Sequence, residues 1–337
     1  MRYYSILLGG SGGSPPSGFP AVDGAAVAGS TWSSWINGAN DPGALNVELD
    51  IFVTAYAIPS GNSWVRVWGI PIQQIAQASQ LNKVAIDVYA GMAPGLPLAN
   101  PAQQGKIAHG TIYPAFGNWI DTDMTLDMVL QAPFTSGNTP DTPNKPAPIV
   151  HSWQQGQPLS EALKTTLSIA FPNFTPEINI SPNLVLGYTD SGFYNTIESF
   201  AGYIRQISQS IMGDSSYPGV LIAPKGNKLV VSDGTQSAGT TKQIEFADLI
   251  GQPTWLGLNT ISVKAMMRGD INVGDTITMP QTLATASAAS APQFRQGSLF
   301  QGKFFVQSIR HVGNFRQPDG ASWCSIFTCA ALNSPAG

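Results

Sequence analysis

Residues 301–332 read QGKFFVQSIRHVGNFRQPDGASWCSIFTCAAL, and this stretch decides the fold class of the chain. Two runs rich in Phe, Val, Ile, Trp and Thr, Lys303–Val312 and Ser322–Ala331, flank a segment that contains Pro-Asp-Gly. Residues of these types favour strands, and Pro-Asp-Gly favours a turn. The pattern therefore predicts a long antiparallel hairpin, which we call the closing hairpin.

The second strand of the closing hairpin has two faces, and neither is strongly polar. Alternation along a strand places Trp323, Ser325, Phe327 and Cys329 on one face and Cys324, Ile326, Thr328 and Ala330 on the other. Since both faces need cover, we expect one to face the interior of a β-barrel and the other to contact a neighbouring subunit. The candidate subunit-interface residues are Phe304, Val306, His311, Trp323 and Phe327.

The composition favours a β-rich chain whose surface is partly covered by partners. Hydrophobic residues make up 43% of the 337 residues, and charged residues only 11%, against roughly 25% in an ordinary soluble domain. The 35 glycines and 26 prolines supply many turns. The net charge of −4 gives no basic footprint, so we expect no specific nucleic-acid binding.

The apolar runs and the two cysteines indicate in which compartment the chain folds. No apolar run approaches the length of a membrane span, and the apolar patch at the start is too short for a secretory signal, so we expect a first strand there. The two cysteines, Cys324 and Cys329, point to opposite faces of one expected strand and do not bridge each other. Small apolar packing residues of this kind fit folding in a reducing cytoplasm.

Residues 1–135 are predicted to form a small antiparallel β-barrel domain. Asn46–Tyr56 alternates between apolar and polar residues, and Trp64–Ile70 follows a turn as the return strand. Ile70–Leu81 is expected to form a short helix, and Trp119–Leu130 a single strand with alternating faces. Residues 136–149 contain four prolines and form the expected linker.

Residues 150–235 are predicted to form an α+β module with two amphipathic helices. Apolar residues at helical spacing follow Pro158, and a second helix starts at Asn195, the expected N-cap, and stops at Gly213. A hairpin of Val220–Ala223 and Lys228–Ser232 accompanies them. Strands resume after this module, so residues 236–337 are expected to form a second, barrel-like domain. The fold class is mainly β, α+β overall.

Several segments resemble baseplate hub proteins of phage tails, the group that includes the late control protein D type. The closing hairpin matches with Phe304-x-Val-x-x-Ile-Arg-His-x-Gly-Asn-Phe-Arg316, followed by Gly320, Trp323 and Phe327. Three other segments of the chain resemble segments of hub proteins from contractile-tailed phages: Asn40–Ile51, Arg66–Ile70 and Ala115–Met124. The resemblance implies two related barrels per chain and a homotrimeric ring in the virion baseplate. It also implies a tail tube protein, a central spike protein and other baseplate proteins as partners.

No arrangement of residues predicts catalysis, and we expect neither enzymatic activity nor a cofactor. Gly9-Gly-Ser-Gly-Gly13 fits the letters of a nucleophile elbow but lies in a Gly/Ser connector. The three histidines fall in three different regions without metal-ligand spacing. The acids after Trp119 lack the Gly and Glu positions of a calcium loop, so we expect no metal site.

Two alternatives stay open at this point. Eight tryptophans and scattered acids would also suit a tail-associated carbohydrate-binding or hydrolytic protein. A tail tube or spike adaptor is a closer structural rival to the hub.

In a hub, DNA passes through the ring, and a channel lined by carboxylates avoids attraction of the DNA phosphates. The candidate channel-facing residues are Asp121, Asp123 and Asp127.

Overall fold

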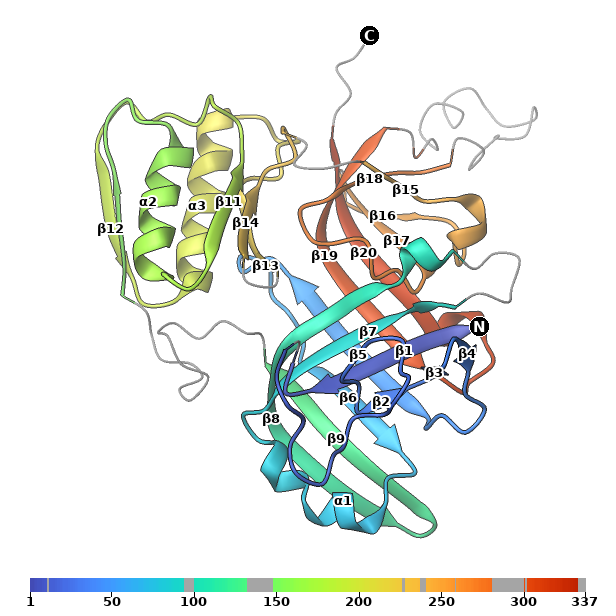
Figure 1. Cartoon of the computed structure of the whole chain (residues 1–337). Helices are drawn as coiled ribbons and strands as arrows, with labels where there is room; N and C mark the ends of the chain where they lie inside the picture. Colours follow the sequence, from blue (N-terminus) through green and yellow to red (C-terminus); the bar gives the residue numbers. More distant parts are fainter. Residues whose placement is uncertain are drawn as a thin grey trace, which may run out of the picture.

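The computed structural model describes residues 1–10, 12–93, 100–131, 148–225, 228–236, 241–257, 259–280, 300 and 302–332. One large sheet of 13 strands fills most of the molecule, and a small α+β module lies beside it (Figure 1). The mainly β fold class is thus confirmed. Among the described residues, no helix has both the length and the apolar character that a membrane crossing requires.

The large sheet runs in the order β16-β17-β20-β19-β5-β6-β9-β8-β7-β1-β2, and β18 joins β15 to β19. All of its ladders are antiparallel except the parallel pair β15–β18. Its strands are β1 Arg2–Leu8, β2 Trp32–Ser33, β5 Val47–Thr54, β6 Ser63–Trp68, β7 Ala85–Met92, β8 Gly105–Ile120, β9 Asp123–Gln131, β15 Lys242–Gln243, β16 Thr254–Gly257, β17 Thr260–Met266, β18 Thr276–Thr278, β19 Lys303–Asn314 and β20 Trp323–Leu332. A separate short hairpin consists of β3 Trp35–Ile36 and β4 Ala39–Asn40.

The predicted closing hairpin is present as β19 and β20, which pair from Lys303↔Leu332 to Gly313↔Trp323. The other edge of β19 pairs with β5, from Ser308↔Thr54 to Asn314↔Glu48. This ladder joins strands of the expected first and last domains in one sheet. No pairing among the described strands closes a barrel, because the path of the sheet ends at β16 and at β2.

Three hydrophobic clusters lie in the described part of the chain. The first packs the alternating residues of β5, β6 and β9 under β1 and β7, and it also takes in Met267 and Trp323. The second gathers residues of β17–β20 with Ala55, and the third lies inside the α+β module. The expected linker, residues 136–149, falls almost wholly outside the described residues.

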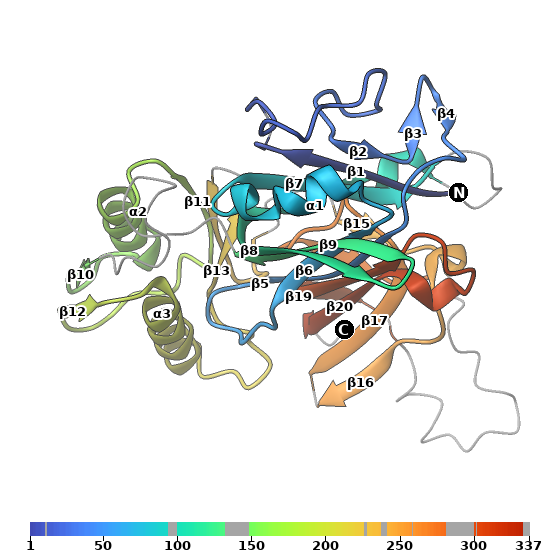
Figure 2. The same ribbon diagram turned by 90° about the horizontal axis from the view of Figure 1, so that it is seen from below.

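The α+β module holds two helices between a two-stranded ribbon and a three-stranded sheet (Figures 1 and 2). On one side of α2, apolar residues spaced three and four positions apart are buried, as the sequence predicts. In α3, Gly213 adopts φ +62° and ends the helix. The elements are α2 Leu159–Ala170, α3 Ile197–Met212, the ribbon β10 Ile149–Trp153 with β12 Asp190–Tyr194, and the sheet β11 Thr175–Asn179, β14 Lys228–Ser232 and β13 Leu221–Lys225.

Three local predictions are wrong. Thr196 and not Asn195 caps α3, because the Thr196 side chain accepts a hydrogen bond from the backbone N–H of Ser199. The segment Trp119–Leu130 is not one strand: β8 ends at Ile120, and β9 begins after a two-residue turn in which Asp121 has φ +54°. The helix expected over Ile70–Leu81 is divided into two short pieces, α1 Ile72–Ala76 and the 3₁₀ helix Ala78–Leu81.

Three further 3₁₀ helices are short connectors. They are Pro101–Gln103, Phe246–Asp248 and Gly320–Ser322.

Candidate functional site

The five candidate interface residues of the closing hairpin are buried inside the chain itself. None of these residues is more than 2% exposed; they are Phe304, Val306, His311, Trp323 and Phe327. All of them except His311 belong to the first or second hydrophobic cluster. The indole N–H of Trp323 donates to the Gly91 carbonyl at 2.9 Å, which fastens β20 to β7. In this structure these side chains stabilise the single chain, while their role between subunits stays a prediction.

The three histidines lie at three separate places. Nδ1 of His311 is 2.8 Å from the Ser325 hydroxyl, and full burial lowers the pKa of His311 to about 3. Nδ1 of His151 is 2.9 Å from the Thr166 hydroxyl, and burial lowers its pKa as well. His109 pairs with the buried Asp87 at 2.6 Å. Among the described residues, no group of three His, Cys, Asp or Glu side chains is placed to hold a metal ion.

The outward face of the large sheet carries a row of paired charges, which we call the charged face: Glu48, Asp50, Arg66, Asp127 and Arg310. The guanidinium of Arg310 donates twice to Asp50, at 2.8 and 2.7 Å. Arg66 donates to Asp127 and lies 3.9 Å from Glu48. The Arg66 guanidinium also lies over two indole rings, at 5.8 and 5.7 Å from their centres; the rings belong to Trp64 and Trp68.

The three candidate channel-facing acids do not form one row. Asp127 lies on the charged face and is bonded to Arg66, and it also accepts from Asn118 at 2.6 Å. Asp121 sits in the β8–β9 turn, where its carbonyl accepts from the Trp119 indole at 2.9 Å. Asp123 is exposed at the first position of β9. Asp123 and Asp127 are four positions apart on β9 and share one face, whereas the turn, which the alternating pattern does not reveal, removes Asp121 from the strand.

Two exposed apolar sites went unnoticed in the sequence. The first is the β8 tip, residues 116–120, where Phe116, Trp119 and Ile120 are 51%, 65% and 68% exposed. The second is β16, where Trp255 and Leu256 are 41% and 62% exposed. For the first site, the available signal in the sequence is the run Phe-Gly-Asn-Trp-Ile directly before a turn.

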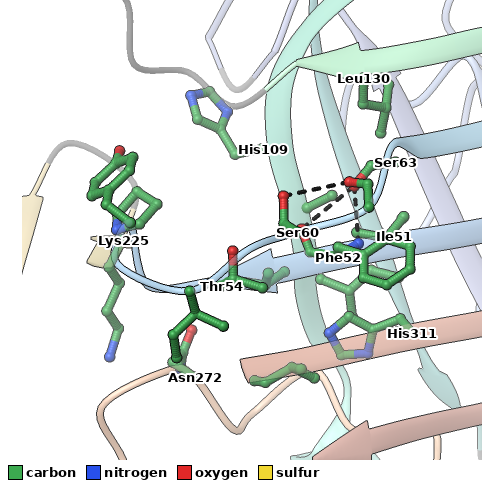
Figure 3. Close-up of a pocket in the computed structure, with 18 of the residues that line it drawn as sticks. Ile51, Phe52, Thr54, Ser60, Ser63, His109, Leu130, Lys225, Asn272 and His311 are labelled. Atoms are coloured by element: carbon green, nitrogen blue, oxygen red, sulfur yellow. Dashed lines mark hydrogen bonds between the residues drawn. The ribbon is translucent and has the colours of Figure 1, made fainter. Parts of the chain in front are cut away.

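A cavity of about 920 Å³ lies where the large sheet meets the α+β module (Figure 3). Its walls come from the turn after β5, the start of β8, the first turn of α3, the end of β13 and the loop after β17. Two polar residues of the lining bond to partners within the large sheet: the Ser63 hydroxyl accepts from Phe52 N at 2.9 Å, and His311 bonds to Ser325. Charged lining residues are Lys106, Glu198 and Lys225.

No protein-family model matches the chain, and no curated protein matches it. Solved structures with a similar course of the chain include the 43 kDa tail protein of prophage MuSo2 from Shewanella oneidensis, with 8% identity over 98% of this chain and 97% of that one and a TM-score of 0.47. The tail protein from Neisseria meningitidis MC58 shows 11% identity over 98% of this chain and 96% of that one, also with a TM-score of 0.47. A chain of the lidless PdpA-VgrG complex shows 9% identity over 99% of this chain and 66% of that one, at 0.43. At these scores and identities the likeness carries no functional argument.

Proposed function

We propose that the chain is a structural virion protein without catalytic activity, the baseplate hub that connects a tail tube to a central spike. One observation supports this most: the four hub-like sequence segments lie on adjacent strands of the sheet. They are Asn40–Ile51, Arg66–Ile70, Ala115–Met124 and Phe304–Phe327, and they map to β5, β6, β8 with β9, and β19 with β20.

Side chains from these segments bond to one another across the strands. Arg310 pairs with Asp50 although 260 positions separate them, and Asn314 donates to Glu48 at 2.7 Å over 266 positions. The hub-like pattern therefore describes one continuous piece of the sheet. A chance likeness of four separate segments would not require such a shared location.

In the proposed hub, three copies form a ring around the DNA channel. The tail tube, the central spike and other baseplate proteins bind this ring, and the candidate channel-facing acids Asp121, Asp123 and Asp127 border the channel. Arg66 and Arg310 of the charged face are both paired with carboxylates. Such pairing keeps the cations from attracting phosphate, which would slow the passage of DNA.

The proposal is tested on particles of the phage that encodes this chain. Antibodies against the chain, carried on gold, should label one end of the tail, and a reconstruction of that end should hold three copies. Labelling along the whole tail, labelling of the capsid, or absence of the chain from purified particles would overturn the proposal.

The carbohydrate-binding alternative needs a platform of exposed aromatic rings. All eight tryptophans lie in the described part of the chain, and only two of them, Trp119 and Trp255, are more than a third exposed. These two lie on β8 and β16, and six other strands separate β8 from β16 in the sheet order. The hub therefore remains the preferred function, and binding of the purified chain to host polysaccharide would favour the alternative.

A further inference from the structure

The β8–β9 hairpin ends in a tip that exposes large apolar side chains on both of its faces. Alternation along β8 places Phe116 and Ile120 on one face and Trp119 on the other. More than half of each of these residues is exposed. The whole hairpin, residues 105–131, belongs to the described part of the chain. Figure 1 shows this end of the hairpin as the lowest part of the molecule, with α1 beside it.

The β8 tip is held rigidly although it projects. Strand pairing continues to the last residues before the turn, from Phe116↔Asp127 to Ile120↔Asp123. Helix α1 braces one side of the hairpin, since a Cβ added at Gly117 would lie only 2.5 Å from Cγ2 of Ile75. A preorganised tip of this kind loses little conformational entropy when a partner binds it.

The indole of Trp119 can be buried without leaving a polar group unsatisfied. Its N–H, the only hydrogen-bond donor of the side chain, already donates to the Asp121 carbonyl at 2.9 Å within the turn. Burial of a donor that has no acceptor would cost free energy, and this bond removes that cost. Trp119 is therefore suited to an apolar pocket, and tryptophan is a frequent anchor of protein–protein contacts.

The charge of the hairpin limits what the tip can bind. Residues 107–131 contain three aspartates and neither lysine nor arginine. Arg66 pairs with Asp127, whereas no ion pair joins Asp121 or Asp123 to another described residue. These acids oppose contact between two such tips and also approach to an anionic lipid surface. A surface that carries lysine or arginine is complementary to them.

We infer that the β8 tip inserts into an apolar cleft of a different protein, and that the rim of this cleft carries lysine or arginine side chains. A cleft fits better than a flat surface, because the apolar side chains project from both faces of the hairpin. Trp119 and Ile120 are the anchors, and Asp121 and Asp123 meet the cations of the rim. The inference rests on the proposed function only for the class of partner, the tail tube protein or the central spike protein. Acids that border a channel at its mouth also face the next protein along it.

The contact is tested with the purified chain and with the purified tail tube and central spike proteins of the same phage, each measured separately. One of the two should bind the wild-type chain, and Trp119→Ser should weaken this binding by about tenfold or more. Ile120→Ser should act in the same direction, so the test does not depend on the folding of one variant. Ile169→Ser makes the matched change at a 76% exposed position of α2 and should leave binding unchanged.

The charged part of the contact gives a second measurement. Added salt should weaken the wild-type complex, and the double variant Asp121→Asn, Asp123→Asn should reduce this salt dependence. Asparagine tolerates the left-handed backbone at position 121, where φ is +54°, so the turn is kept. Glu161→Gln, at an exposed position of α2, is the control that should leave the salt dependence unchanged.

The inference is overturned if neither tail protein binds, or if the tip variants and the controls bind equally. Two other results would also overturn it. Binding to vesicles of phosphatidylcholine and phosphatidylglycerol that Trp119→Ser abolishes would make the tip a membrane anchor. A change in the mass of the isolated assembly on Trp119→Ser would place the tip between copies of this chain.

These outcomes do not depend on where gold labelling places the chain. Labelling at the tail end, with binding that the tip variants do not affect, would retain the hub and reject this contact. Binding that depends on the tip, with labelling elsewhere, would retain the contact and reject the hub.

Discussion

At the scale of single residues, Arg2 holds the two ends of the sequence together. Its guanidinium donates to four backbone carbonyls in the turn of the closing hairpin, those of Asn314, Phe315, Gln317 and Asp319. Only the planar guanidinium presents five donors in a fixed fork, so one side chain satisfies several carbonyls of a tight turn. The sequence alone gave no reason to single out this arginine.

Replacing Arg2 with lysine should therefore destabilise the protein although the charge is kept. The ammonium of lysine reaches fewer of these carbonyls, and we expect a loss of about 1–2 kcal/mol in the free energy of unfolding. Chemical denaturation of the two proteins measures this difference. An unchanged midpoint would show that the four contacts contribute nothing to stability.

The buried His311 makes stability depend on pH. Its pKa is about 3 in the folded chain and about 6.5 in the unfolded chain, so between these values only the unfolded state binds the proton. Stability is therefore highest above pH 6.5 and falls as the pH drops toward 3. The expected loss from this group at pH 5 is about 2 kcal/mol.

The variant His311→Gln should remove this contribution. The difference in unfolding free energy between pH 7 and pH 5 should shrink by about 2 kcal/mol relative to the wild type, whatever the overall stability of the variant. His151, whose pKa burial also lowers, titrates in both proteins and cancels in the comparison. An equal pH dependence in the two proteins would contradict the assignment.

At the scale of elements, local signals fix the helices, and side-chain geometry fixes their ends. In α3, Ile197, Phe200, Ala201 and Ile204 are buried on one face, as the spacing predicts. The N-terminus differs by one residue from the expectation because Asn195 and Thr196 are both good capping residues. Only the backbone conformation decides which side chain reaches the free N–H groups.

Thr196→Ala should destabilise the protein by about 1 kcal/mol, because the backbone N–H of Ser199 loses its acceptor. Asn195→Ala is the matched control at the neighbouring exposed position and should change stability by less than about 0.5 kcal/mol. Thermal unfolding of both variants measures this contrast. The opposite order would restore Asn195 as the cap.

At the scale of the whole molecule, the dominant feature is the sheet that crosses from the first half of the chain to the last. The β5–β19 ladder joins positions about 260 apart and places Asp50 against Arg310. Among the described strands, the path of this sheet ends at β16 and at β2.

The mass of the isolated protein tests the assembly. One chain has a mass of 35.6 kDa, so the proposed trimer should scatter light as a particle of about three times that mass. A stable hexamer, or a monomer at every concentration, would contradict the trimer.

The sequence by itself determined the elements whose signal is local. The closing hairpin, the alternation of β5, the hairpin of β13 and β14, and the amphipathic helix α2 all follow from periods of two or 3.6 residues and from turn chemistry. The packing role of the two cysteines follows in the same way, and both are buried and unpaired with each other.

Tertiary structure alone decided which strands lie next to one another. The turn at Asp121 escaped notice because apolar Ile120 continues the alternation in the sequence, although it is 68% exposed in the fold. The ribbon β10–β12 and the parallel pair β11–β14 are non-local pairings, which no sequence window contains. Whether an apolar residue such as Trp323 or Trp119 becomes core or edge depends on its neighbours in space, and those neighbours are set by the register of distant strands.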